Sequence, residues 1–234
     1  MVPIRDDNPT KITPYVTYVL ILLNVAVFIY ELSLAPPELM EFFRTWAIIP
    51  RQLTASFEGT LSAQVLPEWL TLVTSQFLHG GFAHVAGNML YLWIFGNNVE
   101  DKLGHGRFIV FYLACGVLAG LAQWFFSSGS DIPSLGASGA IAGVMGAYIL
   151  RFPQAKILTL VPLGIVLLPF RIPALYFLGF WFVMQALSSV ASLSAPMDVG
   201  MNSGGIAYWA HAGGFVFGAI LAPLMGLFRR GSAA

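Results

Sequence analysis

Residues 136–146 read GASGAIAGVMG, and this stretch decides how the rest of the chain is interpreted. Gly139 and Gly143 are four positions apart, so on a helix they share one face, where a second helix backbone can approach closely. A matching pair, Gly214 and Gly218, occurs near the C-terminus. The two glycine pairs therefore predict a close crossing of two helices.

The composition predicts what surrounds this crossing. Of the 234 residues, 57% are hydrophobic and only 9% are charged, where a typical soluble chain has about 25% charged residues. The net charge is zero, which argues against a nucleic-acid partner. The single cysteine, Cys115, excludes an internal disulfide. These values predict a membrane protein with several spans, and leave a very apolar soluble core as the alternative.

A helix needs about 20 apolar residues to cross a bilayer, and six segments are candidates. The fold class predicted is an all-α membrane protein of six transmembrane helices, with a short central fourth helix and a long interfacial first outer loop. Residues 1–14 and 229–234 are expected to be cytoplasmic tails around a 15–228 domain. The six segments are Tyr15–Leu34, Trp69–Phe95, Phe108–Phe126, Ser138–Leu150, Pro173–Leu193 and Ile206–Phe228.

The positive charges predict the orientation, because Lys and Arg gather on the cytoplasmic side. With both termini cytoplasmic, only Arg44 and Arg51 of the 11 basic residues face outward. The outer loop Ala35–Pro67 is then expected to lie in the membrane interface. The prolines of Lys156–Ile172 indicate a cytoplasmic hairpin or a re-entrant piece, not a span.

Polar side chains are costly in hydrocarbon and tend to be functional there. The second span contains His79, His84 and Asn88, the fourth begins at Ser138, and the sixth contains His211. At about 1.5 Å per residue, Ser138 lies roughly 20 Å from the cytoplasmic end of its helix, and His84 and His211 lie at similar depth. The acidic residues, in contrast, are all in loops or at span ends.

If the two glycine faces meet, Ser138 and His211 lie together at the outer end of the contact. A serine at a helix N-terminus also has free backbone N–H groups beside it, which stabilise an oxyanion. His84 and Asn88 share a helical face and could donate further hydrogen bonds. The alternatives at this point are a simple N-cap at Ser138, a histidine that bridges two helices, and an interhelical asparagine. No zinc motif of the H-E-x-x-H type occurs.

Four motifs in this order make the chain resemble the rhomboid intramembrane serine proteases. They are His84-x-x-x-Asn88, Gly96-x-x-x-Glu100, Gly136-x-Ser138-Gly139 and Ala210-His211-x-x-Gly214-x-x-x-Gly218. The resemblance implies Ser138 as nucleophile and His211 as general base, without a catalytic acid. It implies an oxyanion hole of His84, Asn88 and the Ser138 N–H. Gly96 and Glu100 resemble a structural motif, and His79 resembles a support for the first outer loop.

The resemblance further implies transmembrane protein substrates in a lipid bilayer and no cofactor, metal or nucleic acid. It favours a bacterial cytoplasmic membrane. Where many family members have an aromatic residue that stacks on the histidine, this sequence has Ala142, so another group must orient His211. The Gly- and Ser-rich loop Ser194–Gly205 is expected to gate the site. A non-catalytic binder of transmembrane helices and a small proton-relay transporter are the alternatives.

Overall fold

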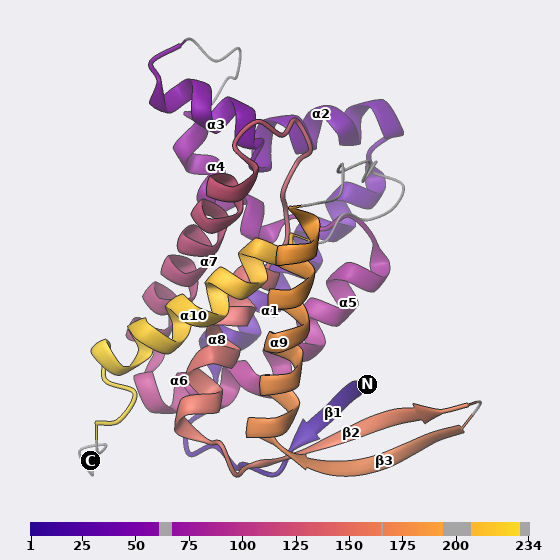
Figure 1. Cartoon of the computed structure of the whole chain (residues 1–234), viewed down its shortest axis with the longest axis vertical. Coiled ribbons are helices and arrows are strands. Elements are labelled where there is room, and N and C mark those ends of the chain that lie inside the picture. Colours follow the sequence, from indigo (N-terminus) through magenta and orange to yellow (C-terminus); the bar gives the residue numbers. More distant parts are fainter. Residues whose placement is uncertain (61–66, 165, 194–206, 230–234) are drawn as a thin grey trace.

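The computed structural model describes residues 1–60, 67–164, 166–193 and 207–229. The fold is mostly helical, with a small sheet at one end of the helical bundle (Figure 1). The helices are α1 Tyr15–Ser33, α2 Pro36–Trp46, α3 Pro50–Phe57, α4 Glu68–Thr74, the 3-10 turn η1 Ser75–Phe77, α5 Phe82–Tyr91, the π-helical turn η2 Leu92–Gly96, α6 Asn97–Leu103, α7 His105–Ser127, α8 Ser138–Arg151, α9 Ala174–Ser192 and α10 Tyr208–Leu224; the strands are β1 Val2–Asp6, β2 Lys156–Leu163 and β3 Val166–Pro173.

Three of the described helices, α1, α7 and α9, are long and apolar enough to cross a membrane, and α10 is a shorter apolar helix. The 14-residue α8 is the short central helix, because residues 139–148 are all buried. It packs against α7, α9 and α10. The structure thus agrees with a membrane bundle around a short helix, while the count of six spans stays a prediction.

The prediction of one continuous helix over Trp69–Phe95 is wrong. The first part ends at Phe77, and α5 begins only at Phe82. The adjacent Gly80 and Gly81 lie in the break, and glycine costs about 1 kcal/mol relative to alanine inside a helix. His79 therefore lies in the break and His84 in the first turn of α5.

The first outer loop contains helices that were not predicted. In α2, Pro36 and Pro37 occupy the first helical positions, where proline is tolerated, and the Glu38 side chain accepts the Ala35 N–H at 3.0 Å. Phe43 of α2 packs with Ala47 and Leu78. Together α2 and α3 cover one end of the bundle (Figure 1).

The prediction of an all-α fold misses a three-stranded antiparallel sheet in the order β1-β2-β3. The segment predicted as a hairpin or re-entrant piece is the hairpin β2–β3. Residues 2–6, expected to belong to a polar tail, pair with β2. The sheet lies at the opposite end of the bundle from α2 and α3 (Figure 1).

Glu100 fixes the start of α1 from inside the bundle. Its buried carboxylate accepts the backbone N–H of Val16 and of Thr17, at 2.9 and 2.8 Å, and the Thr17 hydroxyl at 2.6 Å. A carboxylate at a helix N-terminus satisfies free N–H groups and interacts well with the helix dipole. A methyl group on Gly96 would lie 3.2 Å from Thr17 Oγ1, so Gly96 allows this close approach.

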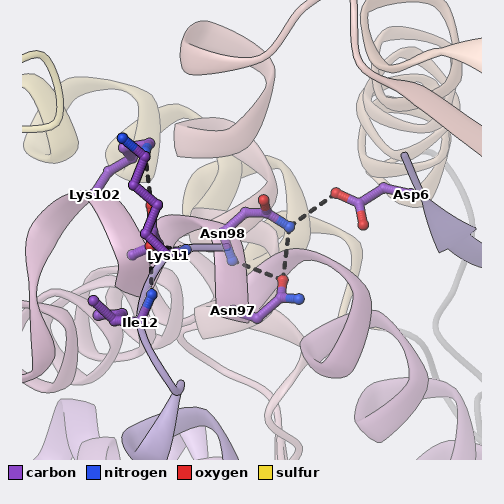
Figure 2. A network of polar contacts seen from close by, with 7 residues as sticks. Asp6, Lys11, Ile12, Asn97, Asn98 and Lys102 are labelled. Carbon is purple, nitrogen blue, oxygen red and sulfur yellow. Dashed lines mark hydrogen bonds and ion pairs between the residues drawn. The ribbon is translucent and has the colours of Figure 1, made fainter. Parts of the chain in front are cut away.

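The chain before α1 is tied to the same region. Figure 2 shows Asn98 Nδ2 donating to Asp6 Oδ2 and to Asn97 Oδ1, both at 2.8 Å. The backbone N–H groups of Lys11 and Ile12 donate to Asp101 Oδ1. The N-terminal strand is thereby held against the end of the bundle.

Candidate active site

Ser138 and His211 form a hydrogen bond inside the bundle. Ser138 is the first residue of α8, and His211 lies in the first turn of α10. The distance from His211 Nε2 to Ser138 Oγ is 2.7 Å. Two residues 73 positions apart in the chain are thus within direct proton-transfer reach.

The glycines of α8 and α10 make this distance possible. A methyl group built on Gly214 would lie 2.2 Å from the carbonyl oxygen of Gly139. One built on Gly218 would lie 2.1 Å from the carbonyl oxygen of Gly143. Real Cβ atoms do not come so close to backbone oxygen, so the two helices touch only because these positions lack side chains.

The other ring nitrogen of His211 is held by Gln185, which the sequence analysis missed. Gln185 Oε1 in α9 lies 2.8 Å from His211 Nδ1. Since an amide oxygen only accepts, Nδ1 carries the proton and Nε2 keeps its lone pair free for the Ser138 hydroxyl. Trp181, one turn earlier, lies beside the imidazole with 5.8 Å between ring centroids.

One sequence signal could have pointed to Gln185. It is the only amide side chain in the predicted fifth span, and polar groups within spans tend to be functional. Gln185 and Trp181 contact His211 in place of the aromatic ring that is missing at Ala142. The group that orients His211 thus comes from α9 and not from α8.

His84 lies close to the loop that leads into Ser138. A methyl group on Gly136 would be 2.8 Å from His84 Nε2 and 3.6 Å from Ser138 Oγ. Gly136 has φ +124°, a backbone conformation that favours glycine, and its N–H donates to the Ser75 carbonyl at 2.8 Å. The missing side chain at Gly136 thus leaves room for His84 beside the serine.

Asn88 is oriented by His79. The Asn88 Nδ2 group lies 3.0 Å from His79 Nε2, and both side chains are buried. One amide hydrogen of Asn88 is used in this contact, which leaves the second available. The His79 ring also packs edge-on against His84, with 5.1 Å between centroids.

His79 was predicted to support the first outer loop. Its described hydrogen bonds go to α1 and to α5. Its backbone N–H donates to Glu31 Oε1 of α1 at 3.1 Å, and its ring contacts α5. Its neighbour Leu78 packs against α2. His79 therefore connects α1 to the oriented Asn88.

The remaining sequence predictions concern the outer loops and the absence of a metal site. The outer-loop acid Asp131 forms an exposed ion pair with Arg51 at 3.1 Å. The predicted gate Ser194–Gly205 lies outside the described residues. Within the described part of the chain, no group of three or more His, Cys, Asp and Glu side chains gathers in a way that could hold a metal ion.

Fold and site together define an integral membrane protein of apolar helices that holds a hydrogen-bonded serine and histidine in its interior. Comparison with known proteins gives the family: the Rhomboid domain matches residues 66–228. The chain therefore belongs to the rhomboid family.

Three relatives illustrate the range of the family. The chain is 34% identical over 177 residues, or 75% of its length, to "Rhomboid protease GluP" of Bacillus subtilis. It is 30% identical over 87% of its length to "Rhomboid protein 1, mitochondrial" of Saccharomyces cerevisiae and 31% identical over 69% to "Rhomboid-like protein 11, chloroplastic" of Arabidopsis thaliana. The matched regions span 29%, 51% and 54% of these relatives' own lengths.

The comparisons place the chain among membrane proteins but not in one particular membrane. Besides a bacterial relative, mitochondrial and chloroplast relatives also match. The expectation of a bacterial cytoplasmic membrane is therefore not supported.

Proposed function

We propose that this protein is an intramembrane serine endopeptidase that cleaves transmembrane segments of membrane proteins with a Ser138–His211 dyad. The observation that carries the proposal is the 2.7 Å hydrogen bond between Ser138 Oγ and an imidazole whose tautomer is set by Gln185. The relative named a rhomboid protease supports the same activity. The proposal includes six spans with both termini cytoplasmic and the site near the outer face.

In this mechanism Ser138 Oγ attacks the scissile carbonyl carbon while its proton moves to His211 Nε2. The tetrahedral intermediate collapses as His211 returns the proton to the leaving amine, which leaves an acyl-serine. Water then repeats the sequence with His211 as base and releases the acid. Gln185 accepts from Nδ1–H and so stabilises the transient imidazolium without a partner carboxylate. This agrees with the absence of an acidic residue at the centre of any predicted span in the sequence.

The oxyanion hole is assigned to the Ser138 N–H, His84 and Asn88. Ser138 begins α8, where the first N–H groups have no partner within the helix. His84 lies beside Gly136, and Asn88 is pre-oriented by His79. Donors that are fixed before the reaction stabilise developing charge without reorganisation.

Labelling with a fluorophosphonate tests the proposed function directly. The purified protein in detergent is expected to form a covalent adduct at Ser138, because a base-activated serine attacks phosphorus as it attacks a carbonyl. Mass spectrometry of the labelled peptide locates the adduct. No labelling at Ser138, with a membrane helix binding the protein uncut, would support the non-catalytic binder instead. Proton-coupled solute uptake would favour the transporter.

Loss of the Gln185 acceptor should lower kcat with little change in KM. Gln185→Leu removes the partner of His211 Nδ1 and should cost about ten- to a hundredfold, equivalent to roughly 1.4–2.7 kcal/mol. Gln185→Glu keeps an acceptor and should retain more of the rate. Thr71→Val in α4 is the control, because it removes a buried hydroxyl that donates to the Glu68 carbonyl of its own helix. Unchanged kcat in Gln185→Leu, measured on a reconstituted substrate, would remove Gln185 from the mechanism.

Asn88→Ala should reduce kcat by about 10²–10³, the usual loss for one oxyanion donor. KM should change far less, because the donor acts on charge that develops only in the transition state. Asn24→Ala is the control, since Asn24 is a buried span asparagine that bonds its own helix at Leu20. An effect confined to KM would show that Asn88 binds substrate or packs helices.

No carboxylate is assigned a catalytic role. Asp131→Asn should leave turnover within about tenfold, or roughly 1.4 kcal/mol, because Asp131 pairs with Arg51 on the surface. The same is expected of Asp198→Asn. A loss near the ~10⁴-fold known for a triad aspartate would show that the dyad lacks a member.

A further inference from the structure

The β2–β3 hairpin has one uncharged face and one face with two basic residues near its base. Because directly paired residues of antiparallel strands share a face, the register defines both sides. One face is free of charge and consists of Ile157, Thr159, Val161, Leu163, Val166, Leu168, Phe170 and Ile172. The opposite face has the two basic residues of the hairpin, Lys156 and Arg171, near its base, and apolar residues further out, namely Leu160, Pro162, Leu167 and Pro169.

Within the described part of the chain, only the base of the uncharged face is covered by protein. Ile157 and Thr159 are fully buried, and Ile157 belongs to the main core of the bundle. Further out, Leu163, Val166, Leu168 and Phe170 are 56, 51, 39 and 44% exposed. A run of large apolar side chains of this kind marks an interaction surface.

The position of the hairpin indicates what this surface meets. Strand β3 ends at Pro173, and the membrane-length helix α9 begins at the next residue. From there the hairpin projects sideways, across the direction of α9 (Figure 1). The base of the uncharged face packs on the helical bundle. The outer part of that face points the same way, toward the bilayer that surrounds the bundle.

Contacts with β1 and with the helices fix the base of the hairpin, and they therefore fix the direction in which the hairpin projects. Strand β1 pairs with β2, and Asp6 at its end accepts hydrogen bonds from Asn98 at 2.8 Å and from the Tyr148 hydroxyl at 2.5 Å. Asp7 forms an ion pair with Arg171 of β3. The sheet is therefore attached to α6 and α8.

A second copy of the chain fits this surface less well than lipid does. A sheet edge usually recruits another strand through free N–H groups, and proline blunts such an edge. The outer strand β3 contains Pro169, which has no N–H, and ends in Pro173. Exposed apolar side chains with basic residues close by are instead typical of an element that lies in a membrane interface.

We propose that the β2–β3 hairpin docks on the lipid bilayer at the cytoplasmic side, with Leu163, Val166, Leu168 and Phe170 inserted among the lipids and Lys156 and Arg171 facing water. The hairpin then anchors the inner end of α9 to the membrane surface. This role is independent of proteolysis and goes beyond the proposed function, and it rests on that proposal only for the cytoplasmic side.

Single-cysteine labelling tests the docking. In a Cys115→Ala background, Leu168→Cys and Val166→Cys on the inserted face are each labelled with an environment-sensitive fluorophore, and Leu167→Cys on the opposite face is the matched control. The proteins are reconstituted in phosphatidylcholine–phosphatidylglycerol vesicles with and without lipids that have a quencher on the acyl chain. Elution volume and thermal unfolding of each variant are compared with the parent.

The expected result is an alternating pattern, with quenching at positions 166 and 168 several-fold stronger than at 167. This pattern should be unchanged when the protein is diluted tenfold into lipid. Weak quenching at all three positions would overturn the proposal, and so would equal quenching on both faces. Protection at 166 and 168 that disappears on dilution would overturn it in favour of a second copy.

Discussion

Ser138→Ala is expected to lower cleavage of a reconstituted transmembrane substrate by several orders of magnitude, because it removes the atom that forms the acyl intermediate. Loss of a serine or histidine from comparable sites costs up to about 10⁶-fold in kcat. The protein itself should remain folded, since the change deletes one hydroxyl. Single-turnover cleavage in proteoliposomes measures the rate, and thermal unfolding checks the fold.

His211→Ala should have a similar effect, and the double variant should be little worse than either single one. Groups that act as one unit give non-additive losses, because either change alone disables the same step. Thr71→Val serves as the control for removal of a buried hydroxyl elsewhere in the bundle, because Thr71 Oγ1 donates to the Glu68 carbonyl in α4. Near-normal cleavage by Ser138→Ala, or losses that multiply in the double variant, would contradict the dyad.

The sequence was informative wherever a local pattern reports a local constraint. Glycines four residues apart predicted the α8–α10 contact, because only a residue without a side chain permits backbone contact at that spacing. The same spacing brought Ser138 and His211 to one end of the contact, where the structure has them hydrogen bonded. The short length of α8 was likewise visible from where apolar residues begin and basic ones appear.

Features that depend on distant parts of the chain were not predictable in this way. Strand β1 at residues 2–6 is defined by its partner at residues 156–163, and no short-range pattern contains that information. Gln185 has a role only because α9 faces α10 at the level of His211. The break at Gly80 and Gly81 was overlooked because the apolar character continues on both sides of it.

Gly218→Ala is expected to destabilise the protein and to inactivate it together. The added methyl group would lie 2.1 Å from the Gly143 carbonyl oxygen and 2.3 Å from its Cα. Both are backbone atoms, so no side chain can rotate away and the helices must separate. Overpacking of this kind costs about 1–3 kcal/mol, and a displacement of about 1 Å at a reacting pair can cost 10²-fold in rate.

Gly179→Ala is the matched control, because Gly179 is also a helical glycine, in α9, and a methyl group there would meet no atom of the described residues within 4 Å. Alanine is the better helix former by about 1 kcal/mol, so this variant should unfold at the same or a higher temperature with unchanged activity. If Gly218→Ala matched it in both measurements, the α8–α10 contact would not be what holds Ser138 against His211. The opposite result would tie the catalytic distance directly to the four glycines from which the helix crossing was predicted. The same backbone contact would then determine both the stability of the bundle and the distance between Ser138 and His211.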